Sequence, residues 1–147
     1  MKPIRGFLIP DITISPLPDI WLEGRYIRIP ALEIQAAILQ KAEFLFGGKV
    51  AVGYVTGQML EEAGAVLDDA EGTIDMLRNI EGVEIAAFLK EKGEAVKVSM
   101  RAKSYANVAE IVSVFGGGGH VKAAGCTLEM DMDEALDAIK KAIGEHF

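Results

Sequence analysis

The sequence is poor in the residues that form covalent or metal crosslinks, with one cysteine and two histidines among 147 residues. One cysteine cannot form a disulfide within the chain or build a zinc site from several thiolates. We therefore interpret Cys126 as a small buried hydrophobic residue. Long apolar runs are also missing, because prolines and acidic residues interrupt the stretch from Phe7 to Leu22, which makes it a poor membrane span. No signal-peptide cleavage pattern follows the basic N-terminus, so we expect a cytoplasmic protein without membrane contact.

Net positive charge is missing as well, since the formal charge is −7. This argues against a generic duplex-DNA binder, because non-specific affinity depends on many Lys and Arg contacts with phosphates. The charge is uneven, however. Between Val96 and Gly125 four basic residues stand against Glu110 alone, so this segment carries +3 and the remainder −10. The four are Lys97, Arg101, Lys103 and Lys122. A basic segment in an acidic chain favours a compact anion site.

The length suits one domain, and half of the residues are apolar while a quarter are charged, as in ordinary globular proteins. All five prolines fall within residues 1–30. We interpret residues 1–30 as an extended arm that packs on the domain or on a partner, and residues 31–147 as the folded domain. Exchange of this arm between subunits could produce a homodimer.

Hydrophobic periodicity predicts an α+β (mixed α/β) fold, with a small central mixed sheet covered by helices. Helices are expected at residues 31–46, 56–60, 73–82, 104–115 and 131–143, and strands at residues 50–55, 83–89, 96–101 and 126–130. Thr56 or Gly57 is predicted to begin the helix at 56–60, Thr73 and Ser104 are predicted to cap their helices, and Asp131 with Glu134 forms a capping-box pattern. The turn from Glu91 to Glu94 joins two strands in the clearest hairpin of the chain.

The strand predicted from Val96 to Arg101 alternates between apolar and polar residues. Because successive side chains of a strand point to opposite faces, Lys97, Ser99 and Arg101 should line one surface. Such a surface is either a solvated polar face or a binding face for an anion.

Four consecutive glycines, Gly116, Gly117, Gly118 and Gly119, precede His120. Each glycine costs about 0.5 to 1 kcal/mol relative to alanine in ordered backbone, so we expect a functional loop here. The pattern is typical of a phosphate cradle built from backbone N–H groups, with a helix beginning near His120 to add its positive end. The spacings of the two common nucleotide-binding loops, G-x-x-x-x-G-K-[ST] and G-x-G-x-x-G after a strand, are not found.

His120 has three interpretations: a hydrogen-bond donor to phosphate, a metal ligand, or a structural histidine. A metal needs several ligands, and the only other histidine, His146, lies next to the C-terminus. We therefore rank phosphate binding first and metal ligation last.

The segment Lys97-Val98-Ser99-Met100-Arg101, followed by Phe115-Gly116-Gly117-Gly118-Gly119-His120-Val121-Lys122-Ala123-Ala124-Gly125, resembles the DHH-associated C-terminal domain of DHH-family phosphoesterases. The likeness is closest to the oligoribonuclease and 3′,5′-bisphosphonucleotide phosphatase group, and it runs from about Leu39 to Ile143. It implies a substrate-binding domain in which Ser99 and Arg101 contact phosphate or sugar. The expected substrate-binding residues are Ser99, Arg101, Gly116, Gly117, Gly118, Gly119, His120 and Lys122.

In that family a separate domain holds two manganese ions through Asp and His residues. This chain contains no Asp-His-His tripeptide, and we interpret the pairs Asp68-Asp69 and Asp131-Asp133 as turn and helix-cap residues. We therefore expect no catalytic residue, metal ligand or cofactor in this chain, and inactivity on its own. The expected partners are a nucleotide or short single-stranded oligonucleotide and a separate catalytic DHH domain.

Two further functions stay open. Related domains occur in alanyl-tRNA synthetases, so the chain could be a non-enzymatic nucleic-acid-binding module. Strand binding relies on base stacking, and only Tyr105 and Phe115 supply aromatic rings near the motif. The third function is an oligomerisation unit that uses the arm of residues 1–30.

Overall fold

A mixed sheet of six strands, in the order β2-β3-β4-β5-β7-β6, organises residues 27–147, the part of the chain that this computed structural model describes. The strands are β2 (Glu43–Leu45), β3 (Val50–Val55), β4 (Ile85–Lys92), β5 (Ala95–Ala102), β6 (Gly118–His120) and β7 (Ala123–Leu128). Only β3 and β4 pair in parallel, and the other neighbours are antiparallel. The predicted α+β fold with a mixed sheet is confirmed. Most of the predicted arm, residues 1–26, lies outside the described residues.

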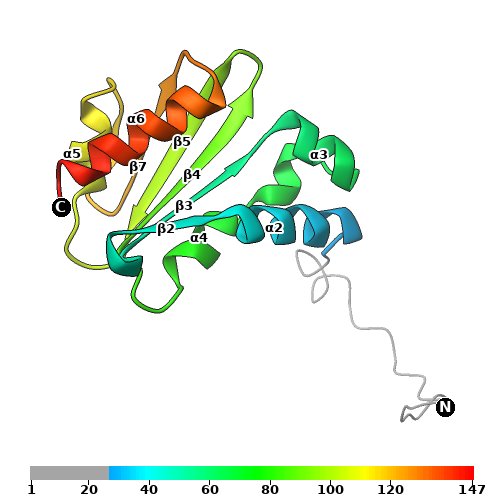
Figure 1. The fold of residues 1–147 in the computed structure, drawn as a ribbon, viewed down its shortest axis with the longest axis horizontal. Helices are drawn as coiled ribbons and strands as arrows, with labels where there is room; N and C mark the ends of the chain where they lie inside the picture. The colour runs from blue at the N-terminus through cyan, green and yellow to red at the C-terminus, as the bar shows by residue number, and fades with distance from the viewer. Residues whose placement is uncertain (1–26) are drawn as a thin grey trace, which may run out of the picture.

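Helices cover both faces of the sheet (Figure 1). The α-helices are α2 (Ile29–Lys41), α3 (Gly57–Ala63), α4 (Thr73–Arg78), α5 (Val108–Ser113) and α6 (Met132–Gly144), with short 3-10 turns η1 (Phe46–Gly48) and η2 (Leu67–Ala70). Figure 1 shows α5 and α6 on one side of the strands and α2, α3 and α4 on the other. None of the helices within residues 27–147 combines the length and apolar character that crossing a membrane requires.

Each face of the sheet has its own hydrophobic core. Ile34, Leu77 and Phe88 belong to the cluster on the α2–α4 side, whereas Met100 and Ile139 belong to the cluster on the α5–α6 side. Burying an aliphatic or aromatic side chain of this size contributes about 1.5 to 3 kcal/mol, so both layers of helices are held mainly by apolar contact. The buried residues of β5 are the even-numbered ones, Val96, Val98 and Met100 among them, as its alternation predicted.

Two of the predicted caps are confirmed. The Thr56 hydroxyl accepts a hydrogen bond from the Met59 N–H (3.2 Å) at the start of α3. At the start of α6 the Asp131 carboxylate accepts from the Glu134 N–H (2.8 Å), and the Glu134 side chain accepts in return from the Asp131 N–H (3.4 Å).

The other two caps were predicted wrongly. Gly72, with φ of 88°, precedes α4, and the buried Thr73 hydroxyl donates backward to the Ala70 carbonyl (2.7 Å). Asn107 caps α5 by accepting from the Glu110 N–H (3.1 Å). Ser104 is instead engaged by Glu84, which a local capping rule could not foresee.

Several predicted boundaries were also wrong. The first helix ends at Lys41 rather than at residue 46, because Glu43–Leu45 leaves the helix and pairs with β3 as the edge strand β2. The helix at 73–82 ends at Arg78. The strand expected at 126–130 begins three residues earlier, at Ala123.

Glu84 is a buried carboxylate that fixes the loop between β5 and α5, with only 5% of its surface exposed. Its oxygens accept hydrogen bonds from the backbone N–H groups of Ser104 (3.0 Å), Tyr105 (2.8 Å) and Ala106 (2.9 Å), and from the Ser104 hydroxyl (2.9 Å). Burial alone would raise the pKa of Glu84, but these donors outweigh burial and lower it. The ionised form is therefore the one that the fold stabilises.

We predict that Glu84→Gln destabilises the protein by about 2 kcal/mol, since a carboxamide brings its own N–H donors against backbone donors. The stabilisation from a lowered carboxyl pKa is complete above the ordinary glutamate pKa of about 4.3 and disappears as the pH falls through the lowered value. Denaturant unfolding at pH 7 and pH 3 should therefore show a smaller difference between wild type and variant at pH 3. Glu81→Gln, at an exposed neighbouring position, is the control, and equal stability of all three proteins at pH 7 would contradict the prediction.

Candidate functional site

One part of the sheet surface is left without a covering helix. On the α2–α4 side, α4 packs over β4 and β5, whereas Ala123, Gly125 and Thr127 of β7 stay partly or fully exposed. An open groove of about 440 Å³ follows this surface across β5, β7 and β6. Its lining includes Lys97, Ser99, Arg101, Gly118, Ala123, Gly125 and Thr127.

Strand register brings the predicted residues onto this surface. Ser99 lies opposite Gly125 and Arg101 opposite Ala123 in the β5–β7 pair. In the β6–β7 pair, Gly118 lies opposite Gly125, and His120 lies opposite Ala123. Directly opposed residues of an antiparallel pair share a face. Ser99, Arg101, Gly118 and His120 are therefore brought together.

Gly118 and Gly119 belong to the edge strand β6, while Gly116 and Gly117 lie in the connection between α5 and β6. The helix predicted to begin near His120 was wrong, because the chain turns after His120 and returns as β7. Gly116 has φ of 79° and follows the last turn of α5, where a residue in the left-handed region commonly ends a helix.

Close packing explains two of the remaining glycines. A Cβ atom on Gly117 would lie 2.6 Å from the Cβ of Cys126 and closer still to the Gly125 carbonyl oxygen. A Cβ on Gly119 would lie 2.6 Å from the Ala123 carbonyl oxygen. Gly118 differs, because no atom lies within 4 Å of the position that its Cβ would occupy. A side chain there would enter the open groove.

The other predicted residues lie at the margin of the groove. His120 is exposed at the end of β6. Lys122 is exposed in the turn between β6 and β7, where its carbonyl accepts from the Ala102 N–H (3.0 Å). Neither side chain lines the groove, and neither do Gly116, Gly117 and Gly119.

Sequence reasoning missed Lys90, which lies opposite Lys97 on the same face. Burial lowers the pKa of Lys90, and the charges of Lys97, Lys92 and Arg101 lower it further, while Glu71 opposes them. The predicted strand stopped at Leu89, one residue short of Lys90. Residues 85–89 of β4 are apolar and buried throughout, so the pairing of Lys90 with Lys97, rather than an alternation in the sequence, reveals its place.

The cations on this face have no carboxylate partners within ion-pair distance among residues 27–147. The salt bridges of that region involve Arg28, Arg78, Lys140 and His146. The Arg101 guanidinium donates one hydrogen bond, to the Met100 carbonyl (3.0 Å), which leaves most of its five N–H donors available.

A second, smaller pocket of about 250 Å³ adjoins the groove and shares Ser99 and Arg101 with it. We call it the side pocket. Its floor is apolar, and its rim carries charges of both signs. The apolar residues are Leu67, Ala70, Ile74 and Phe88, and the charged ones are Glu71, Asp75, Lys90 and Arg101.

The described residues do not fit the manganese ions that the family resemblance implies for a catalytic domain. Within residues 27–147 no three His, Cys, Asp or Glu side chains gather closely enough to hold a metal ion. Asp69 has a structural role, since its carboxylate accepts from the Val66 N–H (2.9 Å) and pairs with Arg28 (2.6 Å). The Val66 bond lowers the pKa of Asp69 against the opposing effect of burial, and Arg28 lowers it further.

The chain belongs to the DHHA1 domain family, whose model matches residues 47–145. It is 35% identical over 113 residues to the bifunctional oligoribonuclease and PAP phosphatase NrnA of Thermus thermophilus, and it spans about a third of that protein's length while 76% of the chain is covered. These matches confirm the resemblance found in the sequence.

Two solved structures share the fold. An exopolyphosphatase-related protein from Bacteroides fragilis superposes with a TM-score of 0.79 at 22% identity, covering 87% of this chain and 38% of that one. The pGpG-specific phosphodiesterase PggH from Vibrio cholerae superposes with a TM-score of 0.59 at 16% identity, covering 87% and 44% of the two chains.

We predict that substitution by alanine lowers the stability of the protein at Gly117 but not at the adjacent Gly118. Gly117→Ala forces a methyl group against β7 and should cost about 1 to 3 kcal/mol of unfolding free energy. Gly118→Ala points into open space at a position without positive φ and should change stability by less than about 0.5 kcal/mol. Urea unfolding of both variants measures the difference, and a tolerant Gly117 would refute the close packing of the glycine run on β7.

Proposed function

We propose that the open groove binds the phosphate-bearing end of a nucleotide or short single-stranded oligonucleotide. The domain would act as the substrate-binding part of a phosphoesterase whose di-metal hydrolytic centre lies outside residues 27–147. The observation that carries this proposal is the set of three cations on one face of the sheet, Lys90, Lys97 and Arg101. None of them lies within ion-pair distance of a carboxylate in the described residues.

Burial lowers the pKa of Lys90, and repulsion from Lys97 and the other nearby cations lowers it further against the opposing charge of Glu71. A bound dianion would reverse the sign of the local potential and favour the charged lysine. Phosphate is a suitable anion because Arg101 can offer it two parallel N–H donors.

The floor of the groove also suits an anion. Gly125, Gly118 and Ala123 carry little or no side chain, so a ligand can approach the backbone closely. β6 is an edge strand, and an edge strand presents unpaired N–H groups that can donate to phosphate oxygens. Ser99 lies between Lys97 and Arg101 along β5 and lines the groove with them.

The similarity to a longer relative supports the proposal that substrate binding and hydrolysis reside in different domains. The curated relative is named for two activities on nucleotide substrates, and this chain spans about a third of it. The hydrolytic centre would therefore be supplied by another part of the protein or by another chain, and the residues described here would position the substrate.

Arg101 provides the sharpest test. Arg101→Lys keeps the charge but loses the planar fork, so it should weaken binding of 3′,5′-bisphosphoadenosine measurably, while Arg101→Ala should cost about 2 to 3 kcal/mol. Isothermal titration calorimetry at two salt concentrations gives both values, and the loss in Arg101→Lys should persist at high salt because the contact is local.

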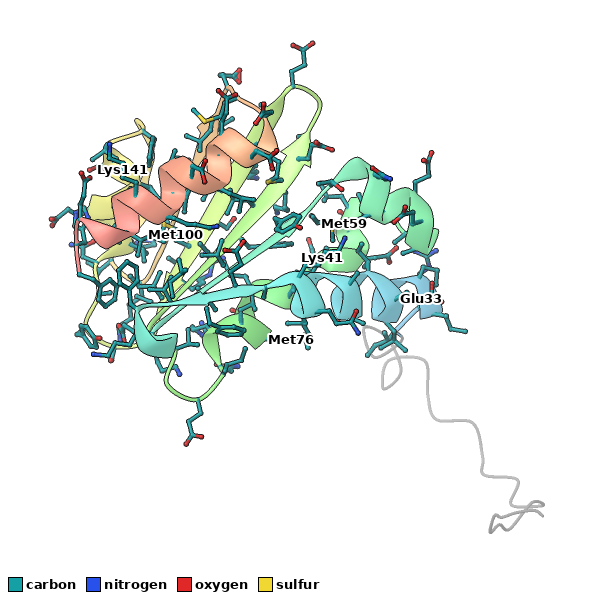
Figure 2. The ribbon with its side chains drawn as sticks, viewed as in Figure 1. Glu33, Lys41, Met59, Met76, Met100 and Lys141 are labelled. Carbon is teal, nitrogen blue, oxygen red and sulfur yellow. The ribbon has the colours of Figure 1, made fainter. Side chains whose placement is uncertain are left out.

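Lys141→Ala is the matched control, since it removes one positive charge from α6 on the opposite side of the sheet (Figure 2). It should bind like wild type. If Arg101→Lys also binds like wild type at every salt concentration, the polar face of β5 is only a solvated surface and the proposal fails.

A further inference from the structure

The side pocket lies next to the open groove but has a different lining. Four apolar residues, Leu67, Ala70, Ile74 and Phe88, form its floor, and all except Leu67 are buried. Its volume of about 250 Å³ is below the range of about 300 to 1,000 Å³ that whole ligands of drug size occupy. The pocket therefore suits one small, mainly apolar part of a ligand whose other part lies outside it.

The two charged sides of the rim dictate the orientation of that ligand. Arg101 of β5 stands on the side shared with the groove, and Lys90 stands on the neighbouring strand β4. Glu71 and Asp75 stand on the wall formed by α4 and the segment before it. A second phosphate would meet two carboxylates and be repelled. A sugar would place several hydroxyl groups against an apolar floor, where unpaired polar groups are costly.

Glu71 is the better placed of the two carboxylates to accept hydrogen bonds from a ligand. Asp75 is partly neutralised by Arg78, whose guanidinium lies 3.4 Å from it. Glu71 makes no side-chain hydrogen bond or ion pair within 27–147, and its charge reaches Lys90 across the pocket. A carboxylate with free lone pairs at the edge of an apolar pocket favours a planar group that carries N–H donors.

We propose that the side pocket is a nucleobase subsite that selects bases with an exocyclic amino group, with Glu71 as the acceptor for that group. This inference rests on the proposed phosphate groove, because Ser99 and Arg101 line both cavities and would hold the phosphate while the base enters the side pocket. Phe88 and Ile74 contact the face of the base, and the Glu71 carboxylate accepts from its edge.

Matched nucleotides that differ only in the amino group test this selection. Guanosine and inosine 5′-monophosphate form one pair, and adenosine and purine-riboside 5′-monophosphate form the other. We expect wild type to prefer the amino-bearing member of at least one pair roughly tenfold, the factor that corresponds to about 1.4 kcal/mol and lies within the range for a hydrogen bond to a charged group. Glu71→Gln should reduce that preference below about twofold. The glutamine amide can donate a hydrogen bond as well as accept one, so it no longer favours a base that carries an amino donor.

Glu61→Gln, an exposed glutamate of α3 outside the pocket, is the control and should keep the full preference. Thermal unfolding of Glu71→Gln should match wild type, since Glu71 is exposed. Equal affinity for both members of each pair in wild type, or an unchanged preference in Glu71→Gln, would overturn the base subsite.

These measurements distinguish failure of the base subsite alone from failure of the proposed phosphate binding. If the phosphate groove exists and the base subsite does not, Arg101→Ala still weakens every nucleotide while the amino group makes no difference. If no nucleotide binds to wild type, the groove and the subsite are both refuted.

Discussion

Close backbone contact between β7 and its neighbours is the constraint on which the groove depends. Gly125 has no room for a side chain beside the Val98 carbonyl of β5, and Gly117 and Gly119 have none beside β7. Three strands can approach so closely only because these positions carry hydrogen alone. Of these three glycines only Gly125 also lines the open groove, on the part of the sheet that α4 leaves uncovered.

Acidic and basic side chains occupy different environments in this domain. The one buried acidic side chain among residues 27–147, Glu84, is fully engaged by donors from the β5–α5 loop. Lys90, Lys97 and Arg101 share one face of the sheet and form no ion pair within residues 27–147. A buried charge that is completely hydrogen-bonded stabilises one conformation, whereas cations held at fixed spacing by a sheet would suit the proposed binding of an external anion.

The sequence predicted those features that depend on residues within a single strand or helix. The alternation of β5 predicted the common face of Ser99 and Arg101, and the capping box at Asp131 predicted the start of α6. The sequence did not predict those features that depend on contact with residues distant in the chain. The strand β2 exists only by pairing with β3, and Ser104 is taken from its expected cap by Glu84, which is distant in sequence.

The site was predictable to the same extent. The pattern identified the glycine run and the polar strand, but the register with β7 that opposes Gly118 and Ser99 to Gly125 is a property of the whole sheet. Lys90 and the side pocket were missed because both depend on the packing of β4 and α4 beside β5. The packing role of Gly117 and Gly119 likewise becomes visible only when β7 is in place.

A titration of isotope-labelled protein with 3′,5′-bisphosphoadenosine, followed by amide nuclear magnetic resonance, tests the proposed phosphate binding in the open groove most directly. Residues that line the groove should shift most, Ser99, Gly118 and Gly125 first, because the ligand changes the field at their backbone N–H groups. Residues of α6 on the opposite side of the sheet should stay unchanged. Saturable shifts centred on β5, β6 and β7 would support an anion site on the open sheet face, and shifts absent there or centred on α5 and α6 would contradict it.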